Sequence, residues 1–163
     1  MNQIPRGQFS RTLSTAQLAL LIFCASFLIY MYSPQGHPSF TDLLHGAEVM
    51  RVSMSLAHTG DFSDPFFSLP TGHTAHTAPA YVFLYATIAR LAGEGFAGAR
   101  SLWVLNIGFL ALQLALLPVL SKRLGLGLLP GVIAAAFGAV FQPYRVLPEW
   151  ESLFVGALLV LLC

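Results

Sequence analysis

The sequence predicts an all-α integral membrane protein. Charged residues make up 9% of its 163 residues, whereas a soluble domain carries about 25%. Hydrophobic residues make up 56% of the chain, and its mean hydropathy is +0.71. The few charges are separated by apolar runs, several of them long enough to cross a bilayer as helices. These figures exclude an ordinary soluble domain and a disordered chain.

The first apolar run predicts a transmembrane helix at residues 13–32. At about 1.5 Å per residue this run spans the roughly 30 Å of hydrocarbon once. Arg6 and Arg11 precede it, so the positive-inside rule predicts a cytoplasmic amino terminus. A cleaved signal peptide is the alternative, but the run is too long and ends in the bulky residues 29–32.

Residues 33–77 predict an external loop. They hold all five histidines and four of the seven acids, but a single base, Arg51. A segment that is poor in Lys and Arg and follows a helix with a cytoplasmic start belongs outside the cytoplasm.

A surface helix is expected within this loop at residues 41–58. A capping pattern ending at Asp42 predicts its start, and Gly60 lies just beyond its end. Apolar residues recur along it at three- and four-residue steps: Leu43, Ala47, Met50, Met54 and Ala57. We expect an amphipathic helix on the outer membrane surface, with its apolar side in lipid or against the bundle.

Four apolar segments follow the loop, at residues 78–92, 101–121, 124–141 and 153–163. The first would form about 22 Å of helix, which predicts a short or re-entrant helix. Residues 101–121 and 124–141 predict transmembrane helices, and the glycines of 124–141 suit close contact with a neighbouring helix. The last is too short to cross. We therefore expect residues 1–163 to be a single amino-terminal transmembrane module of a longer protein.

Two topologies are compatible with these segments. If residues 78–92 cross the membrane, the Lys122-Arg123 pair is external, against the positive-inside rule, and Glu151 is cytoplasmic. If they dip in and return, or lie flat, that pair is cytoplasmic and Glu151 shares a side with the histidine-rich loop. The second topology places two separated arginines outside. We favour it because it brings the acids together.

Three strings resemble the amino-terminal part of GT-C membrane glycosyltransferases: HGAEVMRVSMSLAHTGDFSDPF, TGHTAHTAPAYVFLYA and PYRVLPEWESLFVGALL. The nearest relatives look like bacterial family-39 enzymes, akin to protein O-mannosyltransferases and aminoarabinose transferases. In that family an acid lies on a surface helix, a Pro-Pro-Leu-Tyr-like motif opens the next apolar segment, and a second acid starts a later helix. Glu48, the string 78–81 (Ala-Pro-Ala-Tyr) and Glu151 match these places. The resemblance covers roughly Leu13 to the end.

The chain also departs from the family pattern. Ala47-Glu48 stands where many relatives have an Asp-Glu pair, and Thr77 stands where many have the Lys that meets the lipid phosphate. In this chain Arg51, His73 or His76 would replace that Lys.

The resemblance implies a GT-C-like helical bundle in the bacterial inner membrane. It also implies a glycosyltransferase that moves a sugar from a polyprenyl-phosphate donor to an acceptor hydroxyl on the external face. Glu48 would take the acceptor proton, a contribution of about 10²–10⁴-fold, and Glu151 would orient the acceptor or a metal. The alternatives are an ion pair of Glu48 with Arg51, and an ordinary helix-start acid at Glu151. Asp42 and Glu149 are secondary candidates.

The lipid phosphate has five candidate partners: Arg51, His73, Thr74, His76 and Thr77. A zinc site at His73-x-x-His76 is the alternative, but it lacks the spacing of a third ligand. A divalent cation is the one cofactor compatible with this interpretation, and the sequence does not predict its ligands. The partners expected are membrane lipid and the polyprenyl-phosphate donor. A nucleic acid is not expected, because the net charge is +1 and no basic run is present.

A rival class is a non-enzymatic polytopic membrane protein, either half of a transporter or an assembly subunit. A fragment that is inactive alone is the third possibility. Charged residues inside the membrane would favour a transporter, whereas the acids of this chain lie in loops and at helix ends.

Overall fold

The computed structural model describes residues 13–32, 48–64, 72–73, 79–93, 96–140 and 151–162. This part of the chain is mostly helical and contains no strand, which confirms the all-α class. Its helices, in chain order, are α1 (Thr15–Met31), α3 (Glu48–His58), α4 (Pro79–Ala92), α5 (Phe96–Arg123), α6 (Leu129–Val140) and α7 (Glu151–Leu162).

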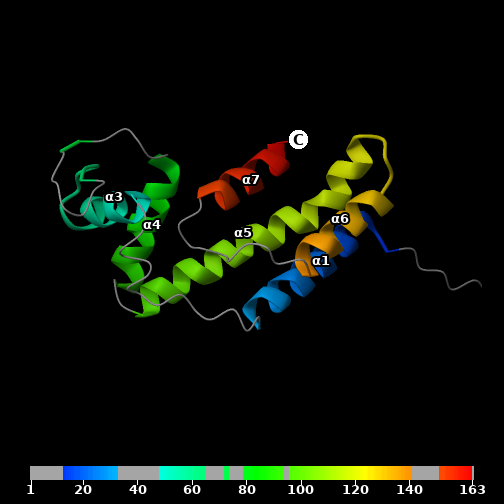
Figure 1. Cartoon of the computed structure of the whole chain (residues 1–163), viewed down its shortest axis with the longest axis horizontal. Coiled ribbons are helices and arrows are strands. Elements are labelled where there is room, and N and C mark those ends of the chain that lie inside the picture. Colours follow the sequence, from blue (N-terminus) through cyan, green and yellow to red (C-terminus); the bar gives the residue numbers. More distant parts are fainter. Residues whose placement is uncertain are drawn as a thin grey trace, which may run out of the picture.

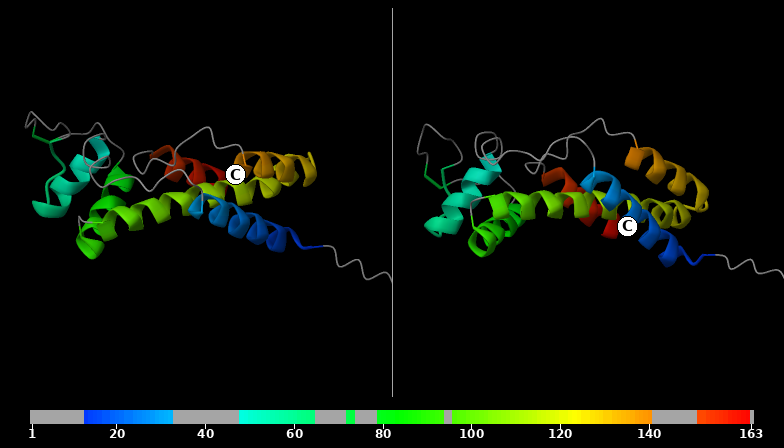
Figure 2. Two further views of the ribbon diagram at one scale, coloured as in Figure 1. Left: turned by 60° about the horizontal axis from the view of Figure 1, so that its bottom comes forward. Right: turned by 90° about the horizontal axis from the view of Figure 1, so that it is seen from below.

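The long helix α5 is the axis of the molecule (Figure 1). Helices α3 and α4 pack together at its amino-terminal end, and α1, α6 and α7 contact the rest of it (Figures 1 and 2). We call α3 and α4, with residues 59–64 and 72–73, the cap. We call α1, α6, α7 and the part of α5 that they contact the bundle. In all views α1 and α6 run toward the cap, whereas α5 and α7 run away from it.

Among the residues described, α5 is the one helix long and apolar enough to cross a membrane. Its 28 residues make about 42 Å of helix, more than the roughly 30 Å of a hydrocarbon core. It begins at Phe96, five residues before the expected segment. Helices α1, α4 and α6 are apolar but shorter. This pattern is weak support for membrane association.

Helix α6 has 12 residues and is shorter than the segment 124–141 expected from the sequence. Residues 124–128 form a turn instead, in which Gly125 and Gly127 have φ values of 77° and 82°. Glycine adopts this left-handed conformation without a steric penalty, so these two residues end α5 before α6 begins.

Small residues bring the bundle helices close together. A side-chain carbon at Gly131 of α6 would lie 2.5 Å from backbone atoms of Leu117 and Pro118 in α5. One at Gly156 of α7 would lie 2.7 Å from the Gln113 amide nitrogen of α5. The contact at Gly131 is a close approach of two backbones, which is typical of helices that pack in lipid, whereas the contact at Gly156 is with the end of a side chain.

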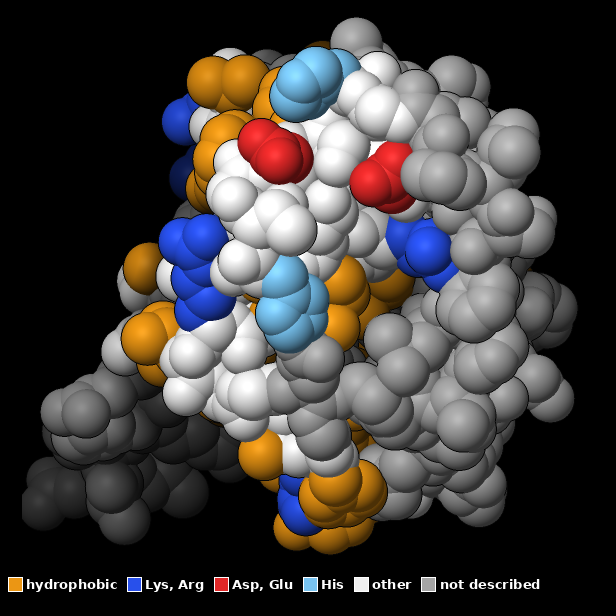
Figure 3. All heavy atoms as spheres, turned by 90° about the vertical axis from the view of Figure 1, so that its left-hand side faces the viewer, with side chains coloured by type: hydrophobic (Ala, Val, Ile, Leu, Met, Phe, Trp, Pro, Cys, Tyr) orange, Lys and Arg blue, Asp and Glu red, His pale blue; other side chains and the backbone are white. Residues whose placement is uncertain are grey.

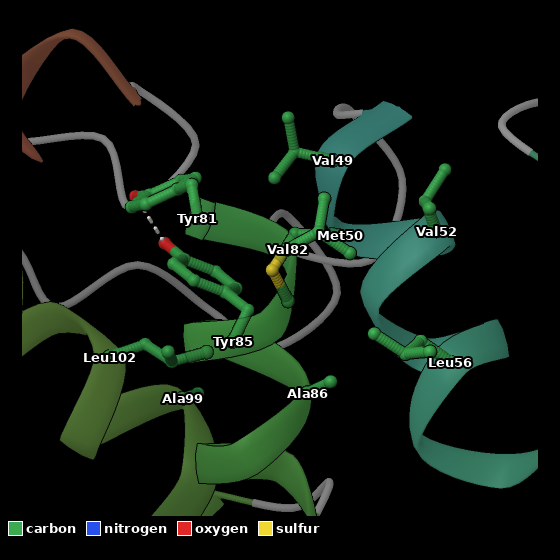
Figure 4. Packing of buried hydrophobic residues seen from close by; sticks show 10 residues of the cluster. All are labelled: Val49, Met50, Val52, Leu56, Tyr81, Val82, Tyr85, Ala86, Ala99 and Leu102. Carbon is green, nitrogen blue, oxygen red and sulfur yellow. Dashed lines mark hydrogen bonds between the residues drawn. The ribbon is translucent and has the colours of Figure 1, made fainter. Parts of the chain in front are cut away.

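The cap has a hydrophobic core of its own, which Figure 4 shows between α3, α4 and the start of α5. The buried residues of α3 are Val49, Met50, Val52, Ser53 and Leu56. The sequence pattern had placed Met54 and Ala57 on the buried stripe, but both are half-buried. Helix α3 packs chiefly against α4, so this neighbour decides which face is covered.

Candidate functional site

The described part of the chain includes four of the predicted site residues. Glu48 is the first residue of α3 and Arg51 lies one turn further along it; both are half-buried. His73 is exposed, and Glu151 is the first residue of α7. The other candidates lie outside the described residues: Asp42, Thr74, His76, Thr77 and Glu149.

The helices that begin with the two candidate acids start near one another. In Figure 1 and in both views of Figure 2, the first turn of α7 points toward the first turn of α3. The amino-terminal ends of α3 and α7 therefore lie on the same side of the bundle, where it meets the cap.

His73 lies at the other end of α3. It forms an antiparallel bridge with Ser63, whose hydroxyl oxygen is 2.9 Å from that of Ser55 on α3. Ser55 follows Glu48 by about two helical turns. Among the candidates for phosphate, Arg51 is thus the described residue close to Glu48 along α3, and His73 is not brought to that first turn.

The segment that carries His73 is held by a close hydrogen-bond pattern around Asp64. The Asp64 backbone nitrogen donates to the Gly72 oxygen over 3.1 Å, and Asp64 Oδ1 accepts from the Gly72 nitrogen over 3.1 Å. Asp64 has a φ of 57°, a left-handed conformation that Asp tolerates better than most residues. These bonds position the His73 backbone beside the second half of α3.

A buried polar triad joins α4 to α5, and the sequence reasoning missed it. The Tyr81 hydroxyl lies 2.9 Å from the Tyr85 hydroxyl and donates to Asn106 Oδ1 over 3.1 Å, and Asn106 Nδ2 donates to the Tyr85 oxygen over 3.0 Å. The three side chains are at most 1% exposed. The three bonds form a closed ring, in which the Tyr81 hydroxyl faces both the Tyr85 oxygen and Asn106 Oδ1 as donor.

The signals for this triad were two tyrosines four residues apart and a lone Asn inside an apolar helix. Tyr81 also closes the string that resembles the family motif, and the structure gives it a packing role between α4 and α5.

Arg90 of α4 binds the carboxyl-terminal end of α3. Its Nη2 donates to the Leu56 oxygen over 2.8 Å and its Nε donates to the Ala57 oxygen over 3.0 Å. These carbonyls belong to the last turn of α3, where the Leu56 oxygen also accepts from the Gly60 nitrogen over 3.2 Å. A cation there also complements the negative end of the helix dipole. Arg90 thereby holds α3 in a fixed position on α4.

The outer surface of the cap is charged. Figure 3 looks onto it and shows acidic, basic and histidine side chains among apolar ones. Within the described ranges, no three His, Cys, Asp or Glu residues gather closely enough to hold a metal ion. The described cap therefore offers charged and hydrogen-bonding groups, and no metal site.

A small apolar pocket of about 10 Å³, room for about one water molecule, lies between α3, α4 and α5. Its lining residues are Met50, Ser53, Met54, Tyr85, Ala89, Gly93, Gly98, Ala99 and Leu102. This surface suits methyl and methylene groups. Its lining has no carboxylate or imidazole, so proton transfer to a carboxylate would take place at the helix starts and not here.

Comparisons with protein-family models, with curated proteins and with solved structures found no match.

Proposed function

We propose that this chain forms the membrane-embedded helical module of a glycosyltransferase with a GT-C-like architecture. It would move a sugar from a polyprenyl-phosphate donor to an acceptor hydroxyl on the external face of the membrane. The observation that carries the proposal is that α3 and α7, which begin with Glu48 and Glu151, start at the same end of the bundle. Two carboxylates near one donor site can divide the roles of base and orienting group.

The helix directions support a topology in which α4 does not cross the membrane. Helix α1 runs toward the cap and α5 runs back, while α4 packs within the cap and makes about 21 Å of helix. With the amino terminus in the cytoplasm, the cap is external and α5 returns Lys122 and Arg123 to the cytoplasmic side. This arrangement satisfies the positive-inside rule at both places.

The proposed step transfers the sugar between two oxygens. The bond from the anomeric carbon to the phosphate oxygen breaks, and a bond to the acceptor oxygen forms. The acceptor proton passes to the Glu48 carboxylate, and the polyprenyl phosphate leaves with the bonding electrons. Arg51, one turn along the same helix, would bind the phosphate, because a guanidinium presents several donors to its oxygens.

Replacing Glu48 tests this proposal. Glu48→Gln keeps the size and removes the proton acceptor, so turnover should fall by about 10²–10⁴-fold. The measurement is the transfer of labelled sugar from a polyprenyl-phosphate donor by the full protein in vesicles. Glu151→Gln should have a smaller effect, and the double change should add little to Glu48→Gln, since residues that act on one transition state are not additive.

The matched control is Asp61→Asn, which removes an exposed acid from the same cap and should leave turnover unchanged. Near-normal transfer by the Glu48→Gln protein would show that Glu48 is not the base, and the ion pair with Arg51 expected from the sequence would take the place of that role.

A further inference from the structure

The turn that joins α5 to α6 has a composition unlike that of a water-exposed turn. We call residues 122–129 the hairpin tip; it lies at the opposite end of the molecule from the cap (Figure 1). Leu124, Leu126 and Leu129 are 66%, 64% and 68% exposed. Lys122 and Arg123 beside them are exposed as well. Turns in water are normally polar, so three outward leucines call for an apolar neighbour.

Hydrogen bonds fix the shape of the hairpin tip. The Leu124 nitrogen donates to the Leu120 oxygen over 2.9 Å, and the Leu126 nitrogen donates to the Ser121 oxygen over 3.0 Å. The Ser121 hydroxyl donates to the Gly127 oxygen over 2.7 Å. The leucines are therefore held outward by a defined turn.

The charge of this region is entirely positive. Residues 96–140 contain no Asp or Glu, and their bases are Arg100, Lys122 and Arg123. The hairpin tip thus combines two cations with three leucines on a fixed turn. This combination suits the boundary of a membrane, where apolar side chains enter the hydrocarbon and cations meet lipid phosphates.

We propose that the hairpin tip binds anionic phospholipids of the leaflet opposite the cap. The leucines enter the edge of the hydrocarbon, and Lys122 and Arg123 pair with headgroup phosphates. The proposal rests on the membrane placement of α5 in the proposed function, and it is independent of sugar transfer. A second copy of the chain is a poorer occupant, because a two-fold contact at the tip would bring two pairs of cations together.

A dye at the hairpin tip tests the contact directly. In the full chain, with Cys24 and Cys163 changed to Ser, Leu126→Cys is labelled with an environment-sensitive dye and placed in nanodiscs. The nanodiscs contain phosphatidylcholine with some phosphatidylglycerol, and one of the two lipids carries bromine near its headgroup. Brominated phosphatidylglycerol should quench the dye more than brominated phosphatidylcholine, because the cations enrich the anionic lipid around the tip.

The expected preference is about fivefold for each cation at low salt, and it should decline as salt is added. Lys122→Gln/Arg123→Gln should remove most of it. Arg100→Gln is the matched control: it removes an exposed base from the other end of α5, more than 30 Å away at about 1.5 Å per residue, and should leave the quenching unchanged.

Equal quenching by both lipids, unaltered by the double change at Lys122 and Arg123, would overturn the proposal. The dye could instead be shielded more as the number of chains per nanodisc rises, with no quenching by either lipid. That result would overturn the lipid proposal and indicate that a second copy of the chain covers the tip. Sugar transfer by the same preparations is scored separately, so failure at the tip and failure at Glu48 are distinguishable.

Discussion

In the cap, α3 buries Val52 and Leu56 against α4 and leaves its end at His58 exposed, whereas in the bundle the outer faces are apolar. The exposed large side chains of α1, α6 and α7 include Leu20, Leu21, Ile133, Phe137, Leu159 and Leu162. The cap encloses an apolar core and carries charged side chains on its surface, where Phe83 and Leu91 of α4 are also 56% and 83% exposed. The bundle exposes many large apolar side chains, buries a core that includes Trp103 and Ile107, and has small residues at its closest helix contacts, as helices in lipid do.

The contacts inside the two regions differ in the same way. The cap is joined to α5 by the ring of hydrogen bonds among Tyr81, Tyr85 and Asn106. In the bundle, α6 and α7 contact α5 at Gly131 and Gly156, beside a buried apolar cluster that includes Trp103 and Ile107. Helix α5 thus serves two regions along its length: its first turns complete the core of the cap, and the rest packs against α1, α6 and α7.

The largest effect is expected from breaking the ring in the cap. Asn106→Ala leaves the Tyr81 and Tyr85 hydroxyls with fewer partners in a site from which water is excluded, and it opens a small cavity. The unfolding free energy of the cap should fall by about 3–5 kcal/mol, since each unsatisfied buried group costs about 1–3 kcal/mol. Hydrogen exchange resolved by segment should become faster in α3 and α4 and stay unchanged in α6.

Ser101→Ala is the control for this change. It removes an exposed hydroxyl from the same helix and should alter the unfolding free energy by less than about 0.5 kcal/mol. If Asn106→Ala raised exchange in α6 as much as in α4, the cap and the bundle would unfold as one unit and the contrast between them would be incorrect.

The helical class was predictable from the sequence, because the composition and the long apolar runs leave few alternatives. The turn at Gly125 and Gly127 was missed, since both lie inside an uninterrupted apolar run that hydropathy alone assigns to one helix. The buried face of α3 was only partly predicted. Val49 and Val52 are covered because of how α4 crosses α3, and that crossing is a tertiary fact with no local signal.

For the candidate site, the sequence predicted a helix start at Glu151 but placed Glu48 within a surface helix expected at residues 41–58. Glu48 and Glu151 each head a helix in the structure. The distance of His73 from the first turn of α3 could not be foreseen, because it depends on the bridge to Ser63. The role of Arg90 was missed since its partners are backbone carbonyls, which every sequence has.

A change of intermediate size is expected from crowding the bundle. In Gly131→Ala the added carbon would lie 2.5 Å from backbone atoms of Leu117 and Pro118, which cannot rotate away, so α6 must shift. The cost should be about 1–3 kcal/mol of unfolding free energy, measured by reversible unfolding in bicelles. Gly108→Ala, on α5 with no atom within 4 Å of the added carbon, should instead stabilise by about 0.5–1 kcal/mol.

The close contact at Gly131 predicts that the two substitutions change the unfolding free energy in opposite directions. If both substitutions were stabilising, α6 would pack on α5 more loosely than the structure places it, and small residues would not explain the bundle.

The smallest effect is expected from a hydrogen bond within the bundle. The Tyr30 hydroxyl of α1 donates to the Gly138 oxygen of α6 over 2.7 Å. Tyr30→Phe should lower the unfolding free energy by only about 0.6 kcal/mol, because helices that separate within a bilayer find other partners for their polar groups. Tyr81→Phe is the matched change in the cap and should cost about 1–3 kcal/mol, since Asn106 Oδ1 then loses a buried donor. Measured in one bicelle preparation, equal losses for the two phenylalanines would mean that the bundle depends on hydrogen bonds as the cap does, and the membrane environment proposed for α1 and α6 would lose its support.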